Sequence, residues 1–243
     1  MRFLGLLLLW AGASLAQDTR VPGSHYMSAP LQALQRDPTQ HPGQLFVAEG
    51  EALFSRPAVN GRRCADCHAV PPAVAARYPV HDAATGRPLT LAARIDRCRQ
   101  THQGEAAQGP DGPAVLALNA LLGERSRGQP VSPDPRLKPW AERGEAVWRQ
   151  RYGQLNLACL QCHDERAGQR LGGAAIPQAH PTGYPVYRLE WQGPGSLQRR
   201  LRGCLTGIRA EAFAPDADEW LALESWLMQR AAGMPWEGMA LRP

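Results

Sequence analysis

The sequence lacks the features that define several protein classes. Beyond residue 16 no apolar run reaches the roughly 18 residues that a membrane-spanning helix needs, so this part of the chain is expected to be soluble. Its 24 Gly and 22 Pro follow no period, which excludes a collagen-like chain, and 44% hydrophobic residues exclude a disordered one. No alternating pattern is long enough to build a sheet. The 243 residues suit one large or two small helical domains.

Lysine is nearly absent, since Lys138 is the only one and every other basic residue is an arginine. After residue 16 basic residues exceed acidic ones by four, and the window 188–209, with five Arg against Glu190, holds that whole excess. A local cluster of this kind points to one anion site, whereas nucleic-acid binding needs a broad basic face with stacking aromatics. We expect no nucleic-acid partner.

The first sixteen residues have the pattern of a secretory signal. Arg2 precedes an apolar run over 3–10, and small residues over 13–16 follow it. This order is typical of a signal peptide cleaved near Ala16, so residues 1–16 are expected to be removed and the protein exported, to the periplasm where a cell has an outer membrane. The absence of a Cys near the cleavage point argues against a lipid anchor.

The chain contains an internal duplication. Three blocks recur in the same order, 50–54 with 144–148, 90–98 with 196–204, and 116–128 with 221–233, and each copy holds three of the six Cys. This repeat predicts two domains, over 46–128 and 140–243, joined by a stiff Pro-rich linker over 129–139. Residues 17–45 lie outside the repeat as an N-terminal extension. It is expected to be irregular. It forms an arm that packs on the second domain or on a partner chain, or it is disordered.

Each copy is predicted to hold a helix, an attachment loop and two further helices. Gly50 and Gly144 let another helix cross closely, and Phe54 and Trp148, one turn later, cover the crossing. The last helices carry apolar stripes at Val115, Leu118 and Leu122 and at Trp220, Leu223 and Leu227. The expected N-caps are Thr90, Asp111, Ser196 and Asp218, and the expected stops are Gly128 and Gly233.

The pentapeptide Cys-x-x-Cys-His occurs once in each copy, at 64–68 and 159–163. Two thiols at this spacing can form thioethers to both vinyl groups of one haem, and the adjacent His can then bind the iron. We expect two covalently bound haem c groups, on Cys64, Cys67 and His68 and on Cys159, Cys162 and His163. A zinc ribbon would need Cys pairs about 15 to 20 residues apart. Disulfides, common in exported proteins, would leave both His residues unexplained.

The residues leave the second iron ligand of each haem open. The candidates for haem 1 are Cys98, His81, His102 and the distant Met27, and those for haem 2 are Cys204, His180, Met228, Met234 and Met239. Only Cys98 and Cys204 occupy matching positions, so the repeat favours His/Cys ligation at both irons. A Cys98–Cys204 disulfide or a pair of inert thiols is the alternative. We interpret His81, His102 and His180 as core or solvent-facing residues.

A thiolate ligand has a functional consequence, because it stabilises ferric iron and lowers the potential, which makes a poor electron shuttle. A sulfur that is not attached to the haem is also a nucleophile. Arg200 lies one helical turn before Cys204 and shares its face. It either binds a small dianion beside the sulfur or pairs with a haem propionate, as Arg94 can in the first copy.

Longer runs resemble the SoxA family, the dihaem subunits of the SoxAX cytochrome complexes of sulfur-oxidising bacteria. The similarity covers nearly all of the chain after residue 16 and includes the runs 74–79, 94–99, 155–159, 183–192, 195–202 and 209–211, together with Cys204. With Cys64, Cys67 and His68 intact, the chain resembles the dihaem type. The resemblance implies an all-α fold of two tandem cytochrome c-like domains.

The resemblance also implies an activity, that of an L-cysteine S-thiosulfotransferase. Such an enzyme oxidatively joins thiosulfate to a Cys of the carrier SoxYZ and passes two electrons to the haem subunit SoxX. Carried over to this sequence, Cys204 is the haem 2 ligand and the active-site Cys, found as a persulfide. Arg200 is then the substrate-binding residue, and Cys98 the haem 1 ligand.

Two other functions remain open at this stage. A thiosulfate dehydrogenase couples two thiosulfates to tetrathionate, but its second haem tends to carry Met, where this chain has Cys204. A plain dihaem electron carrier needs Met or His at the distal positions.

Overall fold

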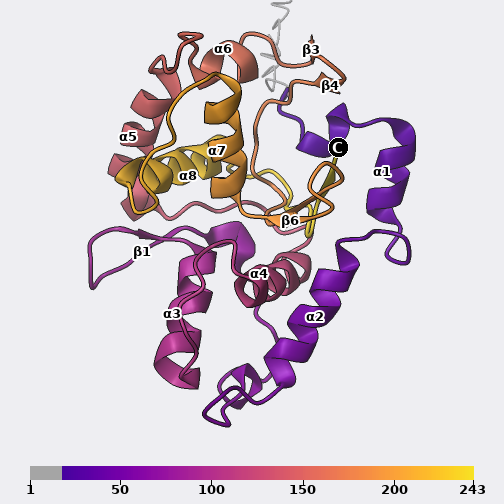
Figure 1. Ribbon diagram of the computed structural model, residues 1–243, viewed down its shortest axis with the longest axis vertical. Coiled ribbons are helices and arrows are strands. Elements are labelled where there is room, and N and C mark those ends of the chain that lie inside the picture. Colours follow the sequence, from indigo (N-terminus) through magenta and orange to yellow (C-terminus); the bar gives the residue numbers. More distant parts are fainter. Residues whose placement is uncertain (1–17) are drawn as a thin grey trace, which may run out of the picture.

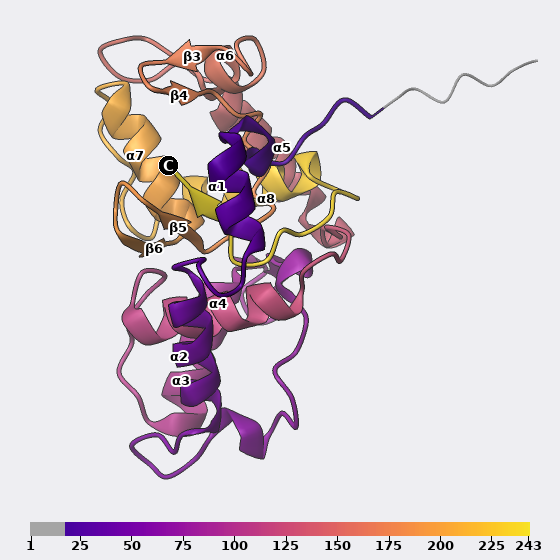
Figure 2. The same ribbon diagram turned by 90° about the vertical axis from the view of Figure 1, so that its right-hand side faces the viewer.

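The computed structural model describes residues 18–243 and shows two helical lobes in contact (Figure 1). Turned by 90°, the first copy of the repeat lies in the lower lobe and the second copy in the upper one (Figure 2). The expected signal segment, residues 1–16, falls outside the described residues. Among residues 18–243, no helix combines the length and the apolar character needed to cross a membrane.

The two lobes repeat one order of helices, as the duplication predicts. The first lobe holds α2 (Gln44–Ser55), the 3-10 turns η2 (Cys64–Asp66) and η3 (Ala75–Arg77), α3 (Leu91–Gln103) and α4 (Pro113–Arg125). The turn η4 (Pro135–Leu137) leads into the second lobe, which holds α5 (Lys138–Arg149), α6 (Cys159–His163), α7 (Leu197–Gly207) and α8 (Asp218–Arg230). The expected helical fold is confirmed.

The strands are two or three residues long and only fasten loops. Antiparallel pairs join β1 (Val80–His81) to β2 (Pro88–Leu89) and β3 (Arg170–Leu171) to β4 (Ala174–Ala175). A small sheet has β5 (Val186–Arg188) at its centre, antiparallel to β6 (Gly193–Gly195) and parallel to β7 (Leu241–Arg242). This sheet brings the last residues of the chain beside the segment that leads into α7.

Two glycines set the closest helix crossings, at matching positions in the two lobes. A Cβ added at Gly50 of α2 would lie 2.3 Å from the carbonyl oxygen of Ala117 in α4, and one at Gly144 of α5 would lie 2.0 Å from that of Ala222 in α8. Real Cβ atoms do not approach a carbonyl this closely, so only glycine fits. The expected close crossing is confirmed in both copies.

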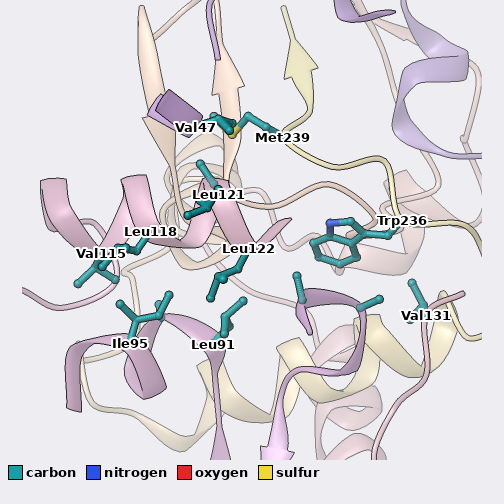
Figure 3. Packing of buried hydrophobic residues seen from close by; sticks show 14 of the residues in the cluster. Val47, Leu91, Ile95, Val115, Leu118, Leu121, Leu122, Val131, Trp236 and Met239 are labelled. Atoms are coloured by element: carbon teal, nitrogen blue, oxygen red, sulfur yellow. The ribbon is translucent and has the colours of Figure 1, made fainter. Parts of the chain in front are cut away.

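The main hydrophobic core joins the two copies. Val115, Leu118 and Leu122 of α4 are at most 8% exposed, as their spacing predicts. Figure 3 shows Leu91 and Ile95 of α3 near this α4 surface, with Met239 from the C-terminal segment beside Val47. Because Met228, Met234 and Trp236 from the second copy belong to the same cluster, the two lobes bury apolar surface together.

Two of the four predicted helix N-caps are confirmed. Thr90 and Ser196 are N-caps, and their side chains accept hydrogen bonds from the backbone N–H groups of Ala93 (3.1 Å) and Arg199 (3.0 Å). The expectation for Asp111 and Asp218 was wrong, because α4 and α8 begin after Gly112 and Ala217. Asp111 instead accepts the backbone N–H of Ser196 at 2.9 Å, which ties the two copies together.

The expected stops are confirmed. Gly128 and Gly233 follow α4 and α8 with φ of +79° and +81°. This left-handed backbone favours glycine and turns the chain away from the helix.

The N-terminal extension is more ordered than expected. It contains the turn η1 (Gly23–Tyr26) and the helix α1 (Ala29–Arg36), which lies against the second lobe in both views (Figure 1, Figure 2). The Gln35 side-chain oxygen accepts hydrogen bonds from the Leu241 N–H at 3.0 Å and an Arg242 guanidinium N–H at 2.8 Å. Of the expected alternatives, the structure favours an arm on the second domain.

Candidate functional site

The second Cys-x-x-Cys-His motif forms the short helix α6, which packs against α5. Cys159, Cys162 and His163 are all half-buried. Residues three and four positions apart share one helix face, so both thiols and the imidazole lie on one side of α6. All six Cys are free thiols in the structure, which leaves them available for other bonds, and no disulfide joins Cys98 to Cys204.

The imidazole of His163 is held in one orientation. Its Nδ1 atom lies 2.7 Å from the carbonyl oxygen of Pro177, so Nδ1–H donates there. The ring also packs on Trp148, with centroids 5.6 Å apart, and the indole N–H of Trp148 donates to Asp164 at 2.9 Å. A metal-binding His commonly donates one ring N–H in this way, which leaves the other nitrogen to bind metal.

The thiol of Cys204 faces this imidazole from α7. The His163 side chain interacts with Cys204, and because Nδ1 is engaged by Pro177, the nitrogen toward the sulfur is Nε2. Burial alone would raise the pKa of the Cys204 thiol, but the interaction with His163 and the positive charge of Arg200 outweigh it. The pKa is lowered, which favours the thiolate.

These donors fit a haem iron. His163 and Cys204 would supply nitrogen and sulfur ligands to a haem iron, and the two thiols of α6 would hold the haem covalently. The alternative ligands Met228, Met234 and Met239 are at most 4% exposed and pack in the core cluster of Figure 3.

His180, the other alternative, lines a cavity of about 290 Å³ together with His163, but its Nδ1 has no hydrogen-bond partner. Burial lowers the pKa of His180 to about 4, so it stays neutral. The sequence left His180 as a core or solvent-facing residue, and here it is 8% exposed.

Two arginines act on Cys204. Arg200 lies one turn before it in α7, and its charge lowers the pKa of the thiol, as does the charge of Arg188 in β5 to a smaller extent. Among residues 18–243, no carboxylate forms an ion pair with Arg200. A half-buried guanidinium without a carboxylate partner beside a reactive sulfur is suited to bind an anion.

From the sequence, Arg188 was identified only as one of the five arginines of the window 188–209. Its side chain pairs with Glu190 at 2.8 Å and lies over the ring of Trp191, whose distance to Arg199 is 4.2 Å. The Nε of Arg188 is buried without a partner. The β5–β6 pair brings Arg188 toward α7. In the sequence, only the run 183–192, which resembles the SoxA family, pointed to this segment.

The first Cys-x-x-Cys-His motif is more exposed. Cys64 is half-buried, and its sulfur accepts a hydrogen bond from the Gln103 side chain at 3.4 Å, while Cys67 and His68 are exposed. Cys98 in α3 lies near Cys67 and Arg94, whose charges influence it. Burial raises the pKa of the Cys98 thiol. The matching cysteines of the two copies therefore differ, and only the second has its thiolate favoured.

Among the described residues, no three or more His, Cys, Asp or Glu side chains are grouped to hold a bare metal ion.

Comparison with known proteins gives matches over both copies. A family model described as the SoxA/TsdA cytochrome c domain matches residues 49–131 and 143–236. The L-cysteine S-thiosulfotransferase subunit SoxA of Rhodovulum sulfidophilum is 33% identical over 219 residues, which is 87% of this chain and 76% of that protein. The protein of the same name from Paracoccus pantotrophus is 31% identical over 231 residues, covering 93% and 80%.

The fold is also similar to a solved structure. The crystal structure of SoxXA from P. pantotrophus contains a chain that superimposes with a TM-score of 0.87 at 30% identity, over 92% of this chain and 87% of that chain. The similarity extends over both lobes and is not confined to one cytochrome c domain.

Proposed function

The chain belongs to the SoxA/TsdA cytochrome c family, and on that premise we propose that it is the catalytic dihaem subunit of an L-cysteine S-thiosulfotransferase. The observation that carries this proposal is the pairing of Cys204 with His163 beside an arginine that lacks a carboxylate partner. A cytochrome c domain of this family carries covalent haem c. We assign one haem to each copy of the repeat, over 46–128 and 140–243.

Cys64 and Cys67 would hold the first haem and Cys159 and Cys162 the second, with His68 and His163 as proximal ligands. Cys98 and Cys204 are assigned as the second iron ligands of haem 1 and haem 2. When bound, the second haem supplies an acceptor for electrons and a positive centre that keeps the Cys204 sulfur deprotonated. The hydrogen bond from His163 to Pro177 fixes the imidazole for this task.

The reaction joins the terminal sulfur of thiosulfate to a carrier thiol. One S–S bond forms, the thiol proton is released, and two electrons leave, so that RSH and S₂O₃²⁻ give RS–S₂O₃⁻, H⁺ and 2e⁻. Arg200 binds the sulfonate end of the dianion through charge-assisted hydrogen bonds. This places the terminal sulfur beside Cys204, which we assign as the active-site Cys.

The partners follow from the family. SoxX would take the electrons as a second haem-bearing chain, since the solved structure described above is that of a SoxXA complex. The carrier SoxYZ would bring the substrate thiol, and the compartment would be the periplasm after removal of residues 1–16. The charges of Arg200 and Arg188, which both act on Cys204, favour a dianionic substrate at this site.

A carrier-dependent assay tests the proposal. In the haem-loaded complex with SoxX, Cys204→Ala should abolish the thiosulfate-dependent modification of SoxYZ, whereas the matched variant Cys98→Ala should retain most of it. Normal turnover by Cys204→Ala would refute the assignment. Tetrathionate formation without SoxYZ would identify a thiosulfate dehydrogenase in its place.

A further inference from the structure

A cleft of about 610 Å³ lies between parts of the two lobes, and no residue of either Cys-x-x-Cys-His motif lines it. Its walls come from β2 and α3 of the first lobe and from the start of α7 and one face of α8 in the second. This volume lies in the range of small-molecule binding sites. None of the residues assigned to the thiosulfate chemistry lines it, so the cleft has no role in the proposed function.

The cleft lies where the two copies of the repeat face each other. Residues at equivalent positions line it in pairs, Tyr78 with Tyr184, Thr90 with Ser196, Leu91 with Leu197, and Asn119 with Glu224. Three of these pairs are chemically alike. The fourth is not, because α4 presents a neutral amide where α8 presents a carboxyl group. The site is thus symmetric in shape and asymmetric in charge.

The charged groups of the cleft other than Glu224 are nearly all engaged. Arg87 pairs with Asp218, and Arg97 pairs with Asp82 at 3.0 Å. Asp96 accepts the backbone N–H groups of Gln108 and Gly109. Asp216 is exposed at the cleft, and neither lining arginine bonds to it. The lining holds four acidic residues against two arginines in a chain whose formal net charge is +5.

Glu224 is the group that this arrangement leaves unsatisfied. Glu224 is half-buried and lines the cleft, and burial raises the pKa of its carboxyl to about 7, with no hydrogen bond or ion pair to oppose the rise. Withdrawing an unpartnered carboxylate from water is costly, and a cation in the cleft would offset that cost.

The other groups around Glu224 favour an organic cation over a bare metal ion. The indole of Trp236 and the rings of Tyr78, Tyr184 and Trp220 share the lining with apolar Leu91 and Met228. Aromatic faces attract ammonium and guanidinium groups, and apolar walls accommodate their alkyl chains. A bare divalent ion would need several oxygen ligands, which one free carboxyl does not supply.

We propose that the cleft between the lobes binds a small organic cation, an alkylammonium or polyamine, with Glu224 as its counter-ion and the aromatic side chains around its carbon chain. The site is independent of thiosulfate conjugation, so it stands whether or not that proposed function holds. Binding would hold the lobes together through a group that touches both copies of the repeat.

Titration calorimetry with spermidine as the probe tests this on the haem-loaded chain. The wild type should bind spermidine saturably at pH 7, and uncharged triethylene glycol should not bind. Glu224→Gln should weaken spermidine binding by about tenfold or more, while Glu219→Gln, on the same helix but outside the cleft, should leave it unchanged. Asn119→Asp should strengthen it, because the variant adds a second carboxyl at the matching position.

Proton release provides a readout that a merely structural role of Glu224 would not give. At pH 7 the carboxyl is about half protonated, so a bound cation should expel a fraction of a proton. The heat of binding should then depend on the buffer in the wild type and not in Glu224→Gln. Equal spermidine affinity in the wild type and Glu224→Gln would overturn the proposal. So would loss of binding when the haem subunit joins the chain, since the occupant would then be a side chain of that partner.

Discussion

The Nδ1 atom of His163 lies 2.7 Å from the carbonyl oxygen of Pro177, and this contact directs the other ring nitrogen toward Cys204. An imidazole fixed by one hydrogen bond loses little freedom when it binds iron, and its ring orientation is set in advance. The Pro177 contact therefore fixes His163 in the orientation that the proposed iron ligation needs.

Cys204→Ala should change the ferric spectrum of the haem-loaded chain, because a neutral methyl group would replace the sulfur that faces His163. Met228→Leu should leave the spectrum unchanged, since Met228 is 3% exposed within the core cluster. The swap conserves volume and should cost less than about 1.5 kcal/mol of stability. Electron paramagnetic resonance of the oxidised protein gives the ferric spectrum of each variant. A spectral change confined to Met228→Leu would place Met at the iron.

Arg200→Ala should reduce kcat/KM for thiosulfate by on the order of a hundredfold, with near-normal haem content, because it removes a charged contact to the dianion. Arg199→Ala is the matched control, since Arg199 lies 4.2 Å over the Trp191 ring. Its effect should stay within about threefold. Steady-state kinetics with thiosulfate, together with the haem content of each variant, measures this difference. Unchanged kinetics in Arg200→Ala would show that Arg200 does not bind the dianion.

Gly144→Ala should destabilise the protein by about 2 to 4 kcal/mol, because its Cβ would lie 2.0 Å from the Ala222 carbonyl oxygen and α5 would have to move off α8. Gly203→Ala, in α7, meets nothing within 4 Å and should stabilise by up to about 1 kcal/mol. Urea unfolding of both variants gives the comparison. Equal stability of the two would mean that the crossing can open without cost.

Glu224 should make the folded state less stable as the pH rises from 4.5 to about 7, because its folded-state pKa of about 7 exceeds the ordinary value of 4.5. In this window the native carboxyl keeps a proton that the unfolded chain has lost, so the free energy of unfolding falls with pH, by on the order of 2 kcal/mol.

Glu224→Gln is the control for this pH dependence. The unfolding free energy of the wild type minus that of the variant should be lower at pH 8 than at pH 5 by about that amount, since the amide does not titrate. A difference that stays constant with pH would show that Glu224 is ionised at both values.

The repeat allowed much of the fold to be predicted. The stripe Val115, Leu118 and Leu122 and the glycines at 50 and 144 are local patterns with a counterpart in the other copy, and all are buried as expected. Local patterns do not determine the exact first residue of a helix. Asp111 had the right type for an N-cap, but the amide of Ser196, distant in the sequence, takes its carboxylate.

The site was predictable to the extent that it lies within one helix or one motif. The spacing of Arg200 and Cys204 follows from α7 alone. The approach of Arg188 depends on β5, and the isolation of Glu224 depends on which arginines of the other lobe are already paired. Such relationships are tertiary, and a single sequence carries no direct signal of them.

The contact of Gln35 with Leu241 and Arg242 links the start of the described chain to its end. These bonds join segments more than 200 positions apart, so the docking of α1 depends on β7 being in place beside β5. A variant in which Leu241 and Arg242 are deleted should leave α1 undocked and open to proteases, however well both lobes had folded.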